Sequence, residues 1–261
     1  MKYIDPSYKI LEQESGIDGL YKQIELAGRT CYKSEDKITE DSAKGFVDRM
    51  IESKHYAMLE HGTVYLRMPT NILDGYDATH SFEDYHDNKY SVCNIQYTED
   101  GKVYACITTN LRVLVENGWM DDLYKYACSP TESHEKRITV RFTCNRQVSH
   151  EFVRHRVFSF AQESTRYCNY TKGKYGNELT FIEPTWSKKD KANHEQMTSA
   201  LHYIETYYKY LIQGGWKPEQ AATLLPNALK TELIMTGTVE DWKHQRFNNY
   251  LKNHDEWIVK S

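Results

Sequence analysis

Three arginines, two serines and a histidine lie within fourteen residues, from 154 to 167. That is a high density of cationic groups in a chain whose formal charge is −4. If the residues after Phe160 are extended, the side chains of Ser164 and Arg166 project to the same side, because side chains alternate along a strand. A hydroxyl beside a guanidinium suits a phosphate or the anionic edge of a ring. The segment therefore predicts an anion-binding site.

The two arginines at the start of this segment should face different surroundings. We expect a helix from about Val148 to Phe158, on which Arg154 and Arg156 lie about 200° apart. Each of the two arginines could then contact a different ligand. The opposing interpretation is an arginine-rich helix whose guanidiniums pair with the excess acidic residues, and spacing alone does not decide between the two.

No metal site is predicted. His150 and His155 are five residues apart, which on a helix places them about 140° apart, so they cannot share a metal as residues four apart do. The six cysteines are scattered singly, with no C-x-x-C pair. Neither a zinc ribbon nor a disulfide framework is indicated.

Composition and residue patterning argue against several classes of protein. Lys and Arg number 33 against 37 Asp and Glu, which disfavours a protein that coats nucleic acid. No apolar stretch reaches the ~18 residues of a membrane span, and Met1 to Ser15 lacks the layout of an export signal, so we expect a cytoplasmic protein. The hydrophobic share is only 39% with tyrosine counted, and this lean composition indicates that copies of the chain share apolar surface.

The elements that position these residues indicate a helix-rich α+β fold with a central antiparallel or mixed sheet. No linker divides the chain, so we expect one domain over residues 1–261. The polar stretch from Asp74 to Lys89 has no period and is interpreted as a surface loop. Periodicity and capping residues predict helices from residue 17 and over 43–51, 111–116, 148–158, 190–213, 219–225 and 239–251, and strands over 62–69, 104–109 and 137–143.

The order Arg154-His155-Arg156, seven residues, Ser164, one residue and Arg166 resembles the signature of the flavin-dependent thymidylate synthases, the ThyX family. Three more stretches are similar to segments of that family and occur in the same order along the chain. They cover 29–32, 55–61 and 225–227, although Ala57 replaces a hydroxyl residue in the second. The resemblance covers most of the chain and leaves an inserted region at about 70–135.

The resemblance implies a ThyX-like single domain and a methyltransferase that converts dUMP to dTMP. Methylenetetrahydrofolate would supply the carbon, FAD would be the cofactor, and NADPH would be the reductant. It also implies a homotetramer with active sites at subunit interfaces, acting on small-molecule substrates without nucleic acid or membrane partners.

Carried over by position, the resemblance also assigns the site residues. His55 would handle a proton, and the other catalytic residues would be Ser164, Arg166 and Arg246. The flavin would meet Glu60, Arg154, His155, Arg156 and His244. The nucleotide would be held by Glu151, Arg154, Gln162, Glu163, Ser164, Thr165 and Arg166.

This sequence departs from the family at Ala222, Glu240 and Asn249, where the family has arginines that contact the nucleotide or the flavin. Arg246, almost one helical turn before Asn249, would lie within ~5 Å of the missing group. The alternatives are a related flavoprotein with different one-carbon chemistry on dUMP, or a homologue of reduced activity. A nucleic-acid-binding module is a further alternative.

One stretch inside the insertion has the form of the family's missing Asn-x-Arg motif. It reads Asn110-Leu111-Arg112 and follows an expected strand. An asparagine that caps a helix is the simpler interpretation of the same residues.

Overall fold

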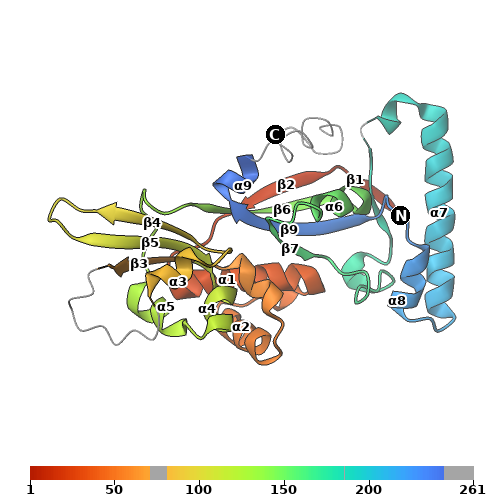
Figure 1. Cartoon of the computed structure of the whole chain (residues 1–261). Helices are drawn as coiled ribbons and strands as arrows, with labels where there is room; N and C mark the ends of the chain where they lie inside the picture. Colours follow the sequence, from red (N-terminus) through yellow and green to blue (C-terminus); the bar gives the residue numbers. More distant parts are fainter. Residues whose placement is uncertain (71–80, 185, 244–261) are drawn as a thin grey trace.

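The computed structural model describes residues 1–70, 81–184 and 186–243, and Figure 1 shows the arrangement of their elements. The expected α+β class is confirmed. Two sheets are antiparallel, with strand orders β2-β6-β9-β7 and β3-β5-β4, and β1 pairs with β8 in parallel. The strands are β1 Lys2–Ile4, β2 Ser7–Leu11, β3 Thr63–Pro69, β4 Val92–Tyr97, β5 Val103–Asn110, β6 Arg137–Asn145, β7 Ser159–Gln162, β8 Thr180–Ile182 and β9 Lys230–Thr238.

The helices gather mainly around the three-stranded sheet and at the opposite end of the molecule (Figure 1). The α-helices are α1 Gly16–Tyr32, α2 Ser42–Glu52, α3 Phe82–His86, α4 Leu111–Asn117, α5 Met120–Tyr126, α6 Arg146–Phe152, α7 Lys191–Gln213, α8 Pro218–Ala221 and α9 Val239–Lys243. Short 3₁₀ helices are η1 Glu35–Lys37, η2 Tyr56–His61, η3 Gly173–Tyr175, η4 Ser187–Lys189 and η5 Ala222–Leu224.

Strand β9 lies inside the four-stranded sheet, between β6 and β7. It pairs with β6 from Asn145↔Lys230 to Arg137↔Thr238 and with β7 at the other edge. Its residues from 233 to 237 are all buried, so they give no alternating pattern. No element was predicted here from the sequence, nor at β1, β2, β4, β7, β8 or α5.

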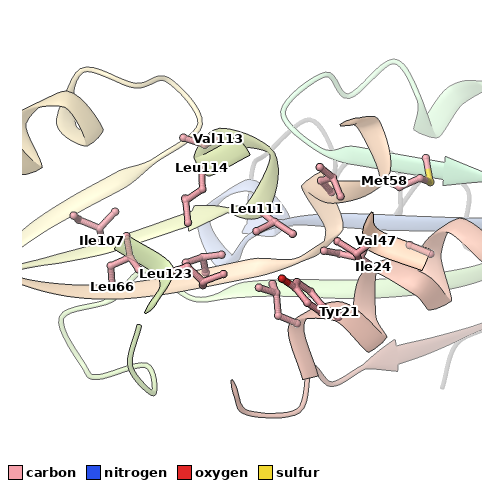
Figure 2. Packing of buried hydrophobic residues seen from close by; sticks show 14 of the residues in the cluster. Tyr21, Ile24, Val47, Met58, Leu66, Ile107, Leu111, Val113, Leu114 and Leu123 are labelled. Atoms are coloured by element: carbon pink, nitrogen blue, oxygen red, sulfur yellow. The ribbon is translucent and has the colours of Figure 1, made fainter. Parts of the chain in front are cut away.

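The first hydrophobic core joins α1, α2 and η2 to the three-stranded sheet, as Figure 2 shows. Ile24, Val47 and Leu66 have no more than a trace of exposed surface in it. Gly62 follows η2 directly, and a Cβ atom there would lie 2.5 Å from Cδ1 of Ile24. Only glycine allows this close approach, so Gly62 lets η2 pack against α1.

The second hydrophobic core packs α6 against β6 and β9. Helix α6 is shorter than the sequence predicted. Helix α6 ends at Phe152, although we expected a helix to Phe158. Both phenylalanines are buried in this core, yet on a continuous helix they would point about 120° apart. The chain instead leaves the helix through turns, among them the hydrogen bond from the Phe158 N–H to the His155 carbonyl (3.2 Å), which return Phe158 to the core.

The other differences between the predicted and the observed elements are local. Part of the expected loop from 74 to 89 is helix α3, because Tyr85 is fully buried and donates a hydrogen bond to Asp122 Oδ2 (2.7 Å). Residues 71–80 lie outside the described part. The helix expected over 219–225 is divided into α8 and η5, and that expected over 239–251 is described only as far as Lys243.

We expect Phe152→Ala to lower the free energy of unfolding by about 3–5 kcal/mol, because the side chain is fully buried and its removal leaves a cavity. The matched control is Val153→Ala, at a neighbouring side chain that is 38% exposed, which should cost less than about 1 kcal/mol. Urea denaturation measures both. Equal losses in the two variants would contradict the packing described for α6.

Candidate active site

A surface hollow lies where the end of α1, the turn before η2 and the residues after β7 meet. Its volume is about 510 Å³. It brings together two residues expected to be catalytic, His55 and Ser164. The hollow is lined by Cys31, Tyr32, Ser53, Lys54, His55, Ser164 and Tyr167.

His55 is oriented by Tyr32. The Tyr32 hydroxyl lies 2.9 Å from Nδ1 of His55, and the Tyr167 ring lies 5.9 Å from the Tyr32 ring, centroid to centroid. Burial, with the nearby Cys31 and Tyr167, raises the pKa of Tyr32, so the phenol stays protonated and can donate. A donor at Nδ1 leaves the proton of a neutral imidazole on Nε2. No sequence pattern predicted this contact, because the two residues are 23 positions apart.

Hydrogen bonds of the backbone fix the position of Ser164. The residues around it are not extended, although the sequence led us to expect an extended segment. Its N–H donates to the Cys31 carbonyl (3.0 Å), and its Oγ accepts from the Arg166 N–H (3.2 Å). Residues 165–167 therefore form a turn, and the extended segment expected from the sequence is wrong. A serine side chain that caps its own turn competes with extended structure. Thr165 is half-buried in this turn, and Arg166 is exposed.

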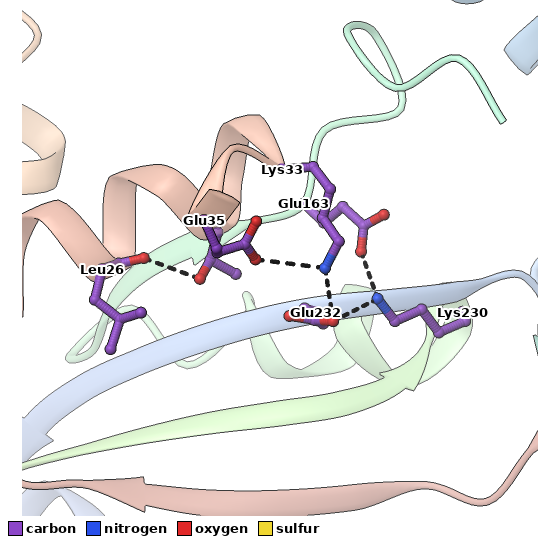
Figure 3. Close-up of polar contacts among 7 residues, drawn as sticks. Leu26, Lys33, Glu35, Glu163, Lys230 and Glu232 are labelled. Carbon is purple, nitrogen blue, oxygen red and sulfur yellow. Dashed lines mark hydrogen bonds and ion pairs between the residues drawn. The ribbon is translucent and has the colours of Figure 1, made fainter. Parts of the chain in front are cut away.

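Glu163 points into a cluster of charges rather than into the hollow (Figure 3). Its carboxylate accepts from Lys230 Nζ (2.8 Å), which also contacts Glu232 (2.6 Å). Lys33 Nζ donates to Glu232 (2.9 Å) and lies 3.4 Å from Glu35. We call these five residues the lysine–glutamate cluster.

The pKa shifts in the lysine–glutamate cluster show which protonation states the cluster stabilises. Burial alone would raise the pKa of Glu232, but the charges of Lys230 and Lys33 outweigh it and lower that pKa to about 2. Burial likewise disfavours the Lys33 ammonium, but Glu232, Glu163 and Glu35 together raise the pKa of Lys33. Both groups are therefore charged at neutral pH.

The other residues expected to bind the nucleotide lie outside the hollow. Gln162 donates from Nε2 to Ser149 Oγ (2.8 Å) and to Thr231 Oγ1 (3.4 Å), which ties β7 to α6 and β9. Glu151 pairs with Arg154 at 2.9 Å, and the arginine side chain is 73% exposed. An exposed pair of this kind contributes little stability and can be displaced.

The residues expected to bind flavin are not gathered in one pocket of the described chain. Arg154 and Arg156 are exposed on the loop after α6, and His155 between them is half-buried. Glu60 lies at the far end of η2 from His55, where its carboxylate accepts from Arg112 Nη1 (2.5 Å). His244 lies outside the described residues, as do Arg246 and Asn249.

Asn110 and Arg112 have separate roles. Asn110 Oδ1 accepts from the Val113 N–H (3.3 Å), so the helix-cap interpretation is confirmed. Arg112 reaches both Glu60 and Glu116, the latter at 2.9 Å. The contact with Glu60 was not predicted, because the two residues are 52 positions apart.

His61, the second histidine of the 55–61 segment, is a core residue. It is fully buried, with Nδ1 2.8 Å from Thr236 Oγ1, which in turn lies 2.9 Å from Thr139 Oγ1. Burial, reinforced by the charge of Arg137, lowers the pKa of His61 to about 3. A neutral His61 thus links η2 to β9 and β6.

The departures from the family pattern have structural roles in this chain. Thr238 donates from its N–H and its hydroxyl to Asp241 Oδ2, each at 2.8 Å, and so begins α9. The Glu240 N–H donates to Glu135 Oε1 (3.4 Å). Trp242 donates from Nε1 to the Ile138 carbonyl (3.1 Å), and Ala222 begins η5.

The described residues hold no group of three or more His, Cys, Asp or Glu side chains that could bind a metal ion. His150 and His155 do not share a helix, because α6 ends at Phe152. None of the helices in 1–70, 81–184 and 186–243 is long and apolar enough to span a membrane.

Comparison with known proteins identifies the family. The family described as thymidylate synthase complementing protein matches residues 89–258, and the chain belongs to it. Flavin-dependent thymidylate synthases from Pyrococcus furiosus and Pyrococcus abyssi are 35% and 32% identical over 117 residues, each match covering 45% of this chain and 47% of the relative. The chain therefore spans about half the length of these relatives.

Two further proteins are similar. The flavin-dependent thymidylate synthase from Geobacter sulfurreducens is 29% identical over 100 residues, which cover 38% of this chain and 41% of that protein. The crystal structure of a UMP/dUMP methylase, PolB from Streptomyces cacaoi bound with 5-Br dUMP, is 12% identical with a TM-score of 0.41, covering 99% of this chain and 93% of that chain.

The buried His61 predicts a pH dependence of stability. Its pKa is about 3 in the folded state and about 6.5 when unfolded, so only the unfolded state gains a proton between these values. Its contribution is complete above pH 6.5 and falls by up to about 1.4 kcal/mol per pH unit below that. We expect His61→Asn to be less stable than the wild type at pH 7 by about 1–3 kcal/mol. The wild type should lose about 2 kcal/mol of this advantage at pH 5, so a gap below that value closes or reverses.

Urea unfolding at pH 7, 6 and 5 measures this gap. The matched control is His86→Asn, at a histidine whose side chain is 71% exposed. A difference between the wild-type protein and His61→Asn that stays constant from pH 7 to pH 5 would contradict the assignment of a neutral, buried His61.

Proposed function

We propose that this protein is an FAD-dependent thymidylate synthase, a methyltransferase that converts dUMP to dTMP with methylenetetrahydrofolate as carbon donor and NADPH as reductant. One observation carries the proposal. In a chain of this family, the signature from Arg154 to Arg166 is complete, and Ser164 of that signature shares a hollow with His55. The names of the relatives support the same reaction.

The nucleotide would be bound by the residues around the turn after β7. Arg166 is exposed beside Ser164, so its guanidinium is open to an anionic ligand. Such a group can pair with a phosphate or stabilise negative charge on the N3/O2 edge of a uracil ring, which makes the ring electron-rich at C5. Glu151, Arg154, Gln162 and Thr165 remain proposed contacts around it.

The residues after α6 fit the flavin cofactor. Arg154 and Arg156 present exposed guanidiniums, and such groups suit the pyrophosphate of a dinucleotide. When bound, FAD supplies the hydride. His55, held at Nδ1 by Tyr32, has Nε2 available to hold or move a proton. Glu60 and His244 are further proposed flavin contacts.

We propose that the site is completed by other copies of the chain in a homotetramer. The observation behind this is the distribution of the site residues. The hollow holds His55 and Ser164, whereas Arg154 and Arg156 are exposed outside its lining. Native mass spectrometry measures the oligomeric state, and a monomer with full activity would refute the shared site.

A second candidate is a flavoprotein with different one-carbon chemistry on dUMP, or a homologue of reduced activity. The observation that favours it is the cap formed by Thr238 and Asp241, at a strand end where the resemblance implies flavin contacts. NADPH oxidation is measured with and without dUMP and methylenetetrahydrofolate, and the nucleotide product is analysed by mass. Oxidation that depends on both substrates, with dTMP as the product, supports the first candidate; another product or none supports the second.

We expect Ser164→Ala and Arg166→Ala each to weaken dUMP binding by roughly tenfold or more, because a hydrogen bond to a charged group contributes about 1.5–3 kcal/mol. FAD binding should persist in both variants. Calorimetry with dUMP and flavin fluorescence measure the two affinities. Lys125→Ala, at an exposed lysine on α5, is the control. Variants that released FAD and kept their dUMP affinity would show that the partition of the segment is wrong.

Arg246→Ala tests the proposed substitute for the arginine missing at Asn249. If Arg246 stabilises charge on the uracil during reaction, turnover should fall by roughly 10²- to 10³-fold while FAD stays bound. Steady-state assays measure kcat, with Lys252→Ala as the control for loss of a cation in the same region of sequence. Unchanged turnover would remove Arg246 from the site.

A further inference from the structure

We infer that Lys33 is a positioning residue for the nucleotide-binding turn, acting through the lysine–glutamate cluster; this inference rests on the proposed function. Lys33 follows α1 directly and lies outside the lining of the hollow. Its effect on the hollow is therefore expected to pass through the residues that it binds.

The backbone of Lys33 has a conformation that is uncommon for a lysine. Its φ is 49° and its ψ is 54°, in the left-handed region. Glycine is the usual residue at such a helix end, because a Cβ atom is unfavourable there. A lysine at this position is strained, and its ammonium compensates by donating to Glu232 at 2.9 Å.

Glu232 and Glu163 share one ammonium, that of Lys230, at 2.6 and 2.8 Å. Lys33 gives Glu232 a second cation, so Lys230 can also hold Glu163. Without Lys33, two mostly buried carboxylates would compete for one lysine, and like charges in a low-dielectric site repel. The side chain of Glu163 is only 2% exposed, so water cannot replace the lost contact.

Glu163 transmits this effect to Ser164. The Glu163 N–H donates to the Glu232 carbonyl (2.8 Å), and the next N–H, of Ser164, donates to the Cys31 carbonyl (3.0 Å). The carboxylate of Glu163 and these two backbone bonds fix the chain at the point where it enters the turn. Figure 3 shows Lys33 above Glu232, with Glu163 and Lys230 beside them. Lys33 therefore sets the position of Ser164 and Arg166.

The test uses the full-length protein with Lys33→Gly, which removes the ammonium but suits the left-handed backbone. We expect dUMP to bind roughly five- to tenfold more weakly and FAD affinity to change little, while the melting temperature falls because Glu232 loses one of its two cations. Lys33→Arg, which keeps the charge, should restore most of the affinity. Asn177→Gly, at another residue with positive φ (56°), controls for the backbone change and should bind dUMP as the wild type does.

The decisive arm is the double variant Lys33→Gly/Glu232→Gln. If Lys33 acts by occupying Glu232, removal of the surplus negative charge should restore dUMP affinity to within about twofold of wild type. Lys33→Gly that binds dUMP like the wild type, or a double variant that binds more weakly still, would overturn the inference. Lys33→Asn, which also tolerates left-handed backbone, replaces the glycine variant if that fails to fold.

Hydrogen exchange separates this inference from the proposed function. The amides of Glu163 and Ser164 should exchange faster in Lys33→Gly than in the wild type, whatever the ligand. A wild-type protein that does not bind dUMP refutes the proposed function, and the exchange rates still test Lys33. Unchanged exchange at both amides would refute the positioning role even if dUMP binds.

Discussion

The fold around the candidate site depends on a mostly buried carboxylate at the start of the central strand. Glu232 is 14% exposed and lies between two ammonium groups. A buried charge costs several kcal/mol unless it is paired, and removal of one partner is strongly destabilising. Lys230 comes from β9 itself, but Lys33 comes from the end of α1. This pairing fixes α1 against β9, and with it Tyr32 and Cys31 on one side of the hollow.

The pairing of Glu232 with Lys33 and Lys230 illustrates why some parts of the fold could be predicted from the sequence and others could not. Helices α2 and α7 bury one face each, so their apolar spacing is visible in the sequence. Strand β9 carries Lys230 and Glu232 next to a run that is buried on both faces, and neither feature is typical of an alternating strand. Its charges are balanced by a residue 199 positions away. Local periodicity cannot reveal a strand whose charges are paired at that distance.

The sequence indicated candidate residues for the site but not how they are arranged. The signature indicated Ser164 and Arg166 as candidates, and the structure places Ser164 and His55 in the lining of one hollow. Spacing could not show that Glu163 is buried or that Ser164 caps a turn. His55 and His61 look equivalent in sequence, yet one lines the hollow and the other is a neutral core residue. Burial is what separates them, and burial is set by the packing of η2 on α1 at Gly62.

Where this chain departs from the family pattern, the residues present stabilise the fold. Thr238, Asp241 and Trp242 cap α9 and fasten it to β6. These residues therefore stabilise the strand end at a place where the resemblance implies ligand contacts. For the proposed flavin site, the exposed guanidiniums of Arg154 and Arg156 must then supply a larger share of the binding free energy. Because exposed charges are screened by salt over about a Debye length of ~10 Å at 0.1 M, flavin affinity in this protein should fall as ionic strength rises.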